Sequence, residues 1–300
     1  MSIPALDTAD SLVDLTSVEV GAQTAGGRFW GKLRRSPSAV VGLGILGVYV
    51  VLAVFGPLLA PFDPGHDILR EQFLPISTRH FLGTDDLGRD EFLMILYGAR
   101  YTLLLGFFAV AIGLAAGLPL GALSGYFGGW VDLLVQRVTD ILLSFPGILL
   151  ALALVAGLGV GLRNVIISVG ISSIPIFTRL VRASALSIRE LPYVEAARAL
   201  GVPHWRILLR HVIPNSLAPV IVQATLQLGA AILVAAGLGF LGLGVQKPTP
   251  EWGSMLGEAR TYIFTDANLV TLPGLAIFGA VLAFNLVGDG LRDALDPRLK

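Results

Sequence analysis

Long runs of apolar residues, separated by shorter polar segments, make up most of the chain. Crossing about 30 Å of hydrocarbon takes roughly 20 residues of α-helix, which sets the length that a spanning run must approach. Six runs come close to it: 39–60, 101–123, 141–157, 165–180, 217–245 and 269–288. A more polar approach from Val131 extends the third run. The pattern predicts an all-α polytopic membrane protein with six transmembrane helices.

The first run, from Ala39 to Ala60, holds no charged residue. It is longer than the apolar segment of a signal peptide, which spans about 7–15 residues, and Pro61 would directly follow the cleavage site. We therefore expect this run to be retained as a signal anchor.

Basic residues near the ends of the runs predict the orientation, because Lys and Arg concentrate on the cytoplasmic side of a membrane. Three basic groups fall on one side of six crossings: Arg28, Lys32, Arg34 and Arg35; Arg179, Arg182, Arg189, Arg198, Arg206 and Arg210; Arg292, Arg298 and Lys300. The loop after the first run is acidic instead, with Asp63, Asp67, Glu71, Asp85, Asp86, Asp90 and Glu91 against Arg70, Arg79 and Arg89. We expect both termini in the cytoplasm.

Composition supports the membrane assignment and excludes several functions. Of the 300 residues, 54% are hydrophobic and 14% charged, whereas soluble domains carry about 25% charged residues. Lys and Arg together number 21, as do Asp and Glu, so a basic nucleic-acid binder is excluded and no nucleic-acid partner is expected. The absence of cysteine excludes disulfides, zinc–thiolate sites and cysteine nucleophiles.

The six runs themselves hold no histidine and no acidic residue, and Asp140 at the edge of the third run comes nearest. Ionisable side chains inside a membrane usually mark proton relays or ion sites. Their scarcity disfavours a proton-driven pump and an embedded metalloprotease, and it leaves a secondary transporter as a weaker alternative. A membrane enzyme also lacks support, since no histidine in a run could activate a serine such as Ser172. We expect no catalytic, cofactor or metal site in this chain.

Glycine recurs every four residues in and after the second run, at Gly113, Gly117, Gly121, Gly125 and Gly129. This spacing predicts a flat ridge where another helix packs closely. Movement along the ridge during gating is a further hypothesis. Proline at 119, 146 and 175 predicts kinked or broken spans.

Four segments resemble ligand-binding motifs without their context. Residues 26–33 lack the hydroxyl of a phosphate-binding loop, and the GxGxxG matches at 42–47 and 237–242 fall in apolar helices. Residues 85–91 depart from calcium-loop spacing. We expect this last segment to be a solvated turn or an extracytoplasmic docking loop, with contacts from Asp85, Asp86, Arg89 and Asp90.

The polar segment at 189–215 predicts a helix, a stop and a second helix. Pro192 suits a first helical turn, Gly201 suits the left-handed residue after a helix, and Pro203 and Pro214 bound the second helix. Ala196 and Ala197 leave a low surface for a partner, flanked by Glu195 and Arg198. An amphipathic hairpin bound to lipid headgroups is the alternative interpretation.

Glu195-Ala196-Ala197, Gly201 and the sequence from His211 to Pro214 resemble the EAA signature of bacterial ABC importer permeases, although His211 and Ile213 depart from its general consensus. Segments 82–90, 250–256 and 288–299 resemble the C-type permease subunits of dipeptide and oligopeptide importers, with nickel permeases as near relatives. The resemblance extends from about Arg34 to the last residue.

The resemblance implies a type I ABC importer permease in the bacterial inner membrane. Its expected partners are a homologous B-type permease, two cytoplasmic ATPases that bind ATP and Mg²⁺, an extracytoplasmic binding protein and membrane lipid. The implied coupling residues are Tyr193, Glu195, Ala196, Ala197, Arg198, Gly201 and Pro214. Short peptides are the expected substrate, while nickel chelates, glutathione and other small solutes remain open.

The expected organisation has five parts. They are a cytoplasmic tail (1–36), a first helix (37–60), an extracytoplasmic loop (61–97), a five-helix permease core (98–290) that contains a coupling loop (182–215), and a cytoplasmic tail (291–300).

Overall fold

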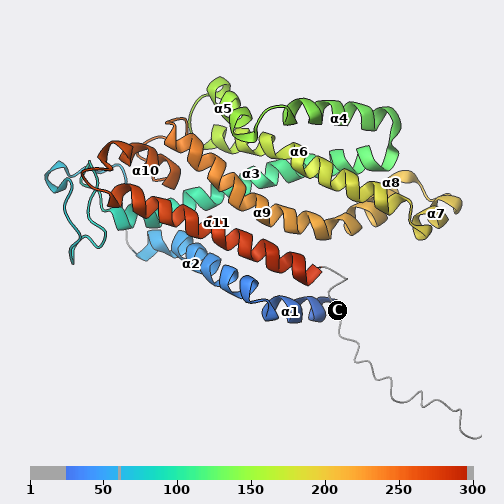
Figure 1. The fold of residues 1–300 in the computed structure, drawn as a ribbon, viewed down its shortest axis with the longest axis horizontal. Coiled ribbons are helices and arrows are strands. Elements are labelled where there is room, and N and C mark those ends of the chain that lie inside the picture. The colour runs from blue at the N-terminus through green and yellow to red at the C-terminus, as the bar shows by residue number, and fades with distance from the viewer. Residues whose placement is uncertain (1–24, 60–61, 296–300) are drawn as a thin grey trace, which may run out of the picture.

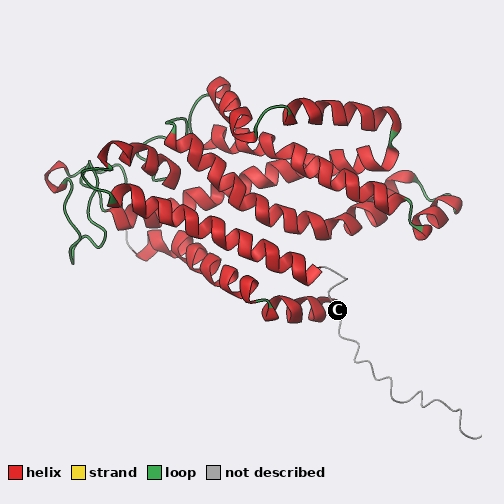
Figure 2. Cartoon of the chain, in the orientation of Figure 1, coloured by secondary structure: helices red, strands yellow, loops and turns green. Residues whose placement is uncertain are grey.

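The computed structural model describes residues 25–59 and 62–295, which form a bundle of helices without a strand in these ranges (Figure 2). Its longer elements are α1 (Ala25–Arg35), α2 (Pro37–Leu59), α3 (Glu91–Phe127), α4 (Gly129–Leu143), α5 (Gly147–Leu158), α6 (Leu162–Arg189), α7 (Pro192–Ala199), α9 (Ile213–Phe240), α10 (Trp252–Ala259) and α11 (Asn268–Leu295). Shorter turns are η1 (Leu69–Glu71), α8 (His204–Ile207), η2 (Leu208–Val212) and η3 (Arg260–Tyr262). The predicted all-α class is confirmed.

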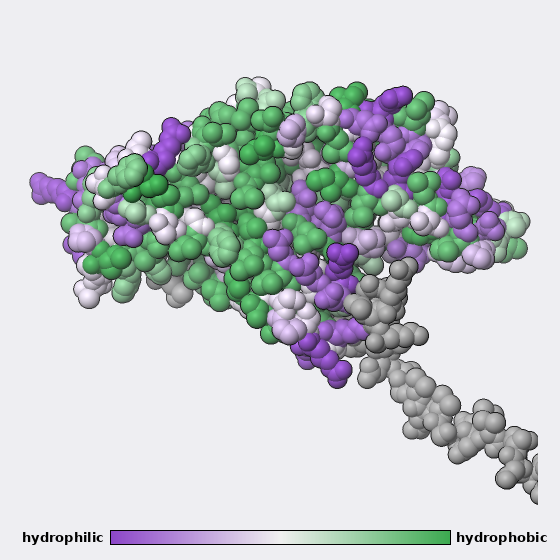
Figure 3. All heavy atoms as spheres, in the orientation of Figure 1, coloured by the Kyte–Doolittle hydropathy of each residue, from purple (hydrophilic) through white to green (hydrophobic). Residues whose placement is uncertain are grey.

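The bundle is elongated and has two distinct ends (Figure 1). The loop after α2 and helix α10 lie at one end, here the α10 end, while α7 and α8 lie at the other, the α7 end. Helix α1 and the last turn of α11 also lie toward the α7 end. Apolar residues cover the middle of the face shown in Figure 3, and polar residues gather toward both ends. This distribution is typical of a protein surrounded by lipid.

Helices α2, α3, α6, α11 and the continuous stretch His204–Phe240 are long and apolar enough to span a membrane, and α4 with α5 forms a sixth span if counted together. Helix α3 begins at Glu91, ten residues before the expected start, so Arg100 lies inside it. The fifth run ends at Phe240 rather than 245. Gly242 has a positive φ of 78° beyond that end, so the second GxGxxG match lies only partly in a helix.

The third run is broken rather than continuous. Helices α4 and α5 meet at 88° across Ser144-Phe145-Pro146. Proline disfavours a helical conformation in the residue before it, which ends α4 ahead of Pro146. Pro119 and Pro175, by contrast, lie inside the continuous helices α3 and α6. Only one of the three predicted interruptions is therefore a break.

The glycine ridge of α3 packs against α6. A Cβ atom added at Gly117 would lie 2.6 Å from the Cβ atom of Phe177, and one at Gly125 would lie 2.6 Å from the carbonyl oxygen of Arg182. Gly113 and Gly121 are equally tight against α6. Gly129 does not extend the ridge, because it begins α4 with a φ of 55° and has open space beside it. Close backbone approach over three turns makes α3 and α6 a single packed unit.

Helix α10 is wedged into the bundle at its own end. Trp252 is fully buried, its indole Nε1 donates to the carbonyl oxygen of Ile95 at 2.9 Å, and Gly98 of α3 leaves the space for its ring. Gly253 lies directly against the backbone of Ala236 in α9. Small residues on three helices therefore seat α10 between α3, α9 and α11.

Candidate functional site

The α7 end carries a short helical elbow whose turn chemistry matches its sequence. Pro192 occupies the first turn of α7, where its missing N–H costs no hydrogen bond. Gly201 has a φ of 73°, which side chains other than glycine adopt with strain. The amide of Gly201 donates to the carbonyl of Arg198 at 2.9 Å, and that of Val202 donates to the carbonyl of Ala197 at 3.1 Å. These bonds close the end of α7 and fix the reversal of the chain.

Pro214 does not end the second helix, contrary to the sequence interpretation. The helix runs from His204 to Phe240, and residues Leu208–Val212 form one π-helical turn just before the proline. The amide of Ile213 donates to the carbonyl of Leu208, five residues earlier. Wider winding ahead of a proline relieves its clash with the preceding turn, so the helix continues.

Most of the elbow faces outward. Val194 is the one buried residue of α7, and it packs with Val181, Ile207 and Val212. Glu195, Ala196 and Arg198 are exposed. Three large apolar side chains of the elbow are exposed as well: Leu200 at 83%, Trp205 at 59% and Tyr193 at 44%. Exposed apolar groups rimmed by charges are typical of a surface that binds another protein.

Polar contacts tie this outward surface to the end of α3. The Arg198 guanidinium lies 5.6 Å from the ring centre of Tyr126 and donates to the carbonyl of Arg189 at 3.1 Å. The Tyr126 hydroxyl lies 2.8 Å from Nδ1 of His204. Arg189 donates to the carbonyl of Gly125 at 2.9 Å. The elbow is therefore anchored where the glycine ridge ends.

The predicted coupling residues share this end of the molecule. Tyr193 receives a hydrogen bond from Asn215 at 3.3 Å, which places its side chain near Pro214. Tyr126, Arg189 and His204 were not among the predicted residues. Tyr126 is 78 residues from His204 along the chain, and no local pattern signals their contact.

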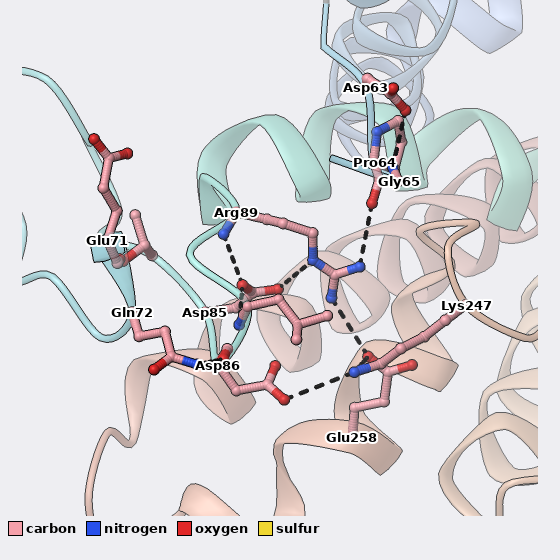
Figure 4. A network of polar contacts seen from close by, with 12 residues as sticks. Asp63, Pro64, Gly65, Glu71, Gln72, Asp85, Asp86, Arg89, Lys247 and Glu258 are labelled. Carbon is pink, nitrogen blue, oxygen red and sulfur yellow. Dashed lines mark hydrogen bonds and ion pairs between the residues drawn. The ribbon is translucent and has the colours of Figure 1, made fainter. Parts of the chain in front are cut away.

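The segment at 85–90 forms a buried network at the α10 end (Figure 4). Arg89 donates from Nε to Oδ2 of Asp85 at 2.7 Å and from its backbone amide to Oδ1 of Asp85 at 2.8 Å. Its Nη1 donates to the carbonyl of Pro64 at 3.4 Å, and Nη2 pairs with Glu258 of α10 at 3.7 Å. Lys247 bridges Glu258 at 3.2 Å and Asp86 at 3.7 Å. Three separate segments of the chain meet at Arg89.

A solvated turn at 85–91 is therefore the wrong interpretation. The side chains of Arg89 and Asp85 are only 2% and 8% exposed. Asp90 caps α3 by accepting from the amide of Leu93 at 3.1 Å and also pairs with His80 at 2.9 Å. Burial raises the pKa of Glu258, while Lys247 and Arg89 oppose that rise. Of the four predicted docking residues, Asp86 and Asp90 keep partial exposure.

Sequence reasoning also missed an acid inside the bundle, because it lies outside the six apolar runs. Glu251 is fully buried at the start of α10 and accepts from the amides of Gly253 at 3.0 Å and Ser254 at 2.9 Å. The hydroxyl of Thr102 in α3 donates to it at 3.2 Å. Burial raises the pKa of Glu251, and these hydrogen bonds oppose the rise. The carboxyl group holds α10 against α3.

In the described part of the chain, no group of three or more His, Asp or Glu side chains is arranged to hold a metal ion.

Two family models match the sequence. The model described as binding-protein-dependent transport system inner membrane component matches residues 117–300. The model described as N-terminal TM domain of oligopeptide transport permease C matches residues 24–76.

Curated relatives resemble the chain over most of its length. The dipeptide transport system permease protein DppC of Alkalihalophilus pseudofirmus is 49% identical over 269 residues, which cover 90% of this chain and 88% of the relative. The glutathione transport system permease protein GsiD of Pectobacterium atrosepticum is 46% identical over 277 residues, 91% of each chain.

Solved structures share the fold at lower identity. A chain of the inward-facing MetNI methionine ABC transporter superposes with a TM-score of 0.56 at 22% identity, covering 68% of this chain and 96% of the other. A chain of an amino acid ABC transporter determined with histidines gives a TM-score of 0.52 at 18% identity, covering 65% and 91%.

Proposed function

The chain belongs to the family of binding-protein-dependent transport system inner membrane components, and we propose on that premise that it forms half of the path of an ATP-driven importer of short peptides. It is a multi-pass inner-membrane permease subunit with an ABC importer permease fold, and it is not itself an enzyme. Two relatives carry dipeptide and glutathione in their names, which supports a small peptide as substrate. Nickel chelates and other small solutes are the alternative cargo.

The proposed orientation places the α7 end in the cytoplasm. Arg179, Arg182, Arg189, Arg198 and Arg206 lie on the elements near that end, which agrees with the cytoplasmic excess of Lys and Arg in membrane proteins. If α4 and α5 together make one crossing, both termini are cytoplasmic and the α10 end faces outward. The five-part organisation with a coupling loop at 182–215 remains our proposal. Its proposed boundaries at residues 98, 182, 215 and 290 do not coincide with helix ends, because each of these residues lies within a helix.

Family membership implies other permease, ATPase and binding-protein components. In the proposed assembly these are a homologous B-type permease, two cytoplasmic ATPases that hold ATP and Mg²⁺, and an extracytoplasmic binding protein. The docking surface for the ATPase is the elbow of Tyr193, Glu195, Ala196, Ala197, Arg198 and Gly201. Exposure of Leu200 and Trp205 beside these residues supports a contact surface at the elbow, and a hairpin bound to lipid headgroups is the alternative interpretation.

The anchored elbow carries the proposal. An ATPase that displaces α7 would also move Val194, which is packed against α6 and the second helix of the elbow. Arg198 and His204 would carry the same displacement to Tyr126 at the end of α3. Because α3 and α6 pack as one unit along the glycine ridge, a push at the elbow would tilt both helices together and switch access to the path.

The test is reconstitution of the complete transporter with its binding protein in liposomes containing ATP. We expect uptake of a labelled dipeptide and stimulation of ATP hydrolysis by the loaded binding protein. Uptake of a nickel chelate with no uptake of peptide would overturn the assigned substrate. Transport by this chain without ATPase partners would overturn the assigned mechanism.

A further inference from the structure

One arginine lies within a spanning helix and faces an apolar groove. Arg100 of α3 lines a groove of about 410 Å³ between α2 and α3. The groove walls are formed by Val50, Val54, Leu103, Leu104 and Phe107, and the side chain of Arg100 is exposed to it. Val54 and Phe107 are 55% and 58% exposed, so this surface is open in the isolated chain.

The depth of Arg100 follows from its neighbours. Tyr97, about one helical turn before Arg100, accepts a hydrogen bond at 2.9 Å from the amide of Phe62, which lies just beyond the end of α2. The α-carbon of Arg100 is about 5 Å further along α3 than that of Tyr97, in the direction away from the α10 end. Long helical side chains point back toward the N-terminal end, here the α10 end. The guanidinium consequently reaches toward the membrane surface on that side.

Within the described ranges, Arg100 makes no hydrogen bond and no ion pair. Two arginines of α6, by contrast, are paired. Arg182 of α6 binds Asp132 at 2.6 Å, and Arg179 binds Asp140 at 2.7 Å. An arginine at membrane depth is costly and normally has an anionic partner. Any anionic partner of Arg100 therefore lies outside the described residues.

We propose that this groove is a phospholipid-binding site, with the lipid phosphate on the Arg100 guanidinium and an acyl chain between α2 and α3. A guanidinium matches phosphate in geometry and charge. The groove has one cationic group at one end and apolar walls along its length. The cationic end matches the phosphate of a phospholipid headgroup, and the apolar walls match its acyl chain. A helix of the partner permease that carries a carboxylate is the competing occupant, and the second experiment below separates it from a lipid.

The site has a structural consequence for α2. In its most apolar stretch α2 is 17% buried, the smallest share among the span helices. A lipid that contacts Val50 and Val54 on one side and Leu104 and Phe107 on the other would fasten α2 to α3. The lipid would occupy the leaflet at the α10 end, which is the outer leaflet in the proposed orientation.

The first experiment measures the phospholipid that co-purifies with the assembled transporter in mild detergent, by native mass spectrometry. Arg100→Gln removes the phosphate ligand, and Val54→Trp fills the groove while Arg100 remains. Arg163→Gln is the matched control, since Arg163 is exposed near the α10 end of α6 and lies outside this groove. We expect both groove variants to lose a bound phospholipid severalfold and the control to retain it.

The second experiment separates a lipid from free phosphate and from a protein partner. Delipidated transporter is mixed with phosphatidylglycerol vesicles or with inorganic phosphate, and its thermal midpoint is measured. We expect the lipid alone to raise the midpoint of the wild type and to have no effect on Arg100→Gln. Equal lipid retention in all variants would overturn the proposal. So would a response to inorganic phosphate alone, or loss of the partner permease from Arg100→Gln with lipid retention unchanged. Peptide uptake by the wild type tests the proposed transport function independently of these outcomes.

Discussion

The two ends of the bundle use polar residues in opposite ways. At the α10 end, Arg89 is buried and binds Asp85, Glu258 and the carbonyl of Pro64, so its bonding capacity is used within the chain. At the α7 end, the elbow leaves Glu195, Ala196 and Leu200 exposed and has Val194 as its buried contact. A surface that binds another protein, as we propose for the α7 end, leaves its polar and apolar side chains free for the partner. A structural scaffold, as at the α10 end, uses its polar side chains in bonds within the chain. The charges of the sequence separate a basic end from an acidic one, but they do not show which end keeps its polar groups free.

Replacing Arg89 with alanine should have the largest effect on stability. The change leaves the buried carboxylate of Asp85 without its partner, and removing one member of a buried ion pair costs about 3–5 kcal/mol. We expect a large fall in the thermal midpoint of the purified transporter. Arg79→Ala is the control, because Arg79 is 74% exposed in its pair with Glu71 and such pairs contribute about 0–1 kcal/mol. Equal midpoints for the two variants would contradict the scaffold role of the α10 end.

Gly121→Ala should have the next largest effect. A Cβ atom there would lie 2.8 Å from the Cβ atom of Val181 and closer still to the carbonyl oxygen of Thr178. Overpacking of this kind costs about 1–3 kcal/mol, and it would push α3 away from α6. Gly44→Ala in α2 is the matched control, since it meets nothing within 4 Å. A midpoint unchanged by Gly121→Ala, measured by thermal denaturation, would contradict the close packing of α3 against α6 on which the proposed joint movement depends.

Tyr126→Phe tests the anchor of the elbow with a smaller effect. It removes the hydroxyl 2.8 Å from His204 and leaves the ring beneath Arg198. One hydrogen bond contributes about 0.5–1.5 kcal/mol, so the fold should persist. We expect less peptide uptake per ATP hydrolysed, measured in liposomes against the wild type. An unchanged ratio would remove this contact from the coupling route.

The smallest effect is expected from Glu258→Gln. Burial raises the folded-state pKa of Glu258 above its unfolded value, so its contribution to stability is fully present below the unfolded pKa and is lost as pH rises through the folded pKa. The neutral amide should keep the pH 7 midpoint near that of the wild type and remove this part of the pH dependence between those two pKa values. Thermal denaturation across pH measures both. A large fall in the midpoint at pH 7 would mean that the ion pairs with Lys247 and Arg89 outweigh burial.

Local chemistry made much of the fold predictable. Apolar runs identified the span helices, four-residue glycine spacing identified the packed face of α3, and Pro192 with Gly201 identified the ends of α7. These signals depend on residues within one or two helical turns of each other. The coupling assignment itself remains a prediction.

The remaining features depend on contacts that are distant along the chain. Burial of Arg89 requires Glu258, and burial of Glu251 requires Thr102 of α3. Pro146 and Pro214 are the same residue type, yet one ends a helix and the other follows a π-helical turn within a continuing helix. The predicted second run starts after Arg100 because this charged residue interrupts the apolar sequence, although residues 92–99 before it are apolar as well. No local pattern contains this information.

The most direct measurement is the ratio of peptide uptake to ATP hydrolysis for Gly201→Glu in the assembled transporter. Gly201 is exposed with open space beside it, and its positive φ sets the direction of the elbow. A bulky acidic residue should therefore misdirect the docking surface at a local cost of about 1 kcal/mol and leave the bundle folded. We predict a complex of normal composition that hydrolyses ATP but imports peptide at least about tenfold more slowly, a change equivalent to 1.4 kcal/mol. Import at the wild-type rate by a fully assembled complex would contradict the role of the elbow in coupling.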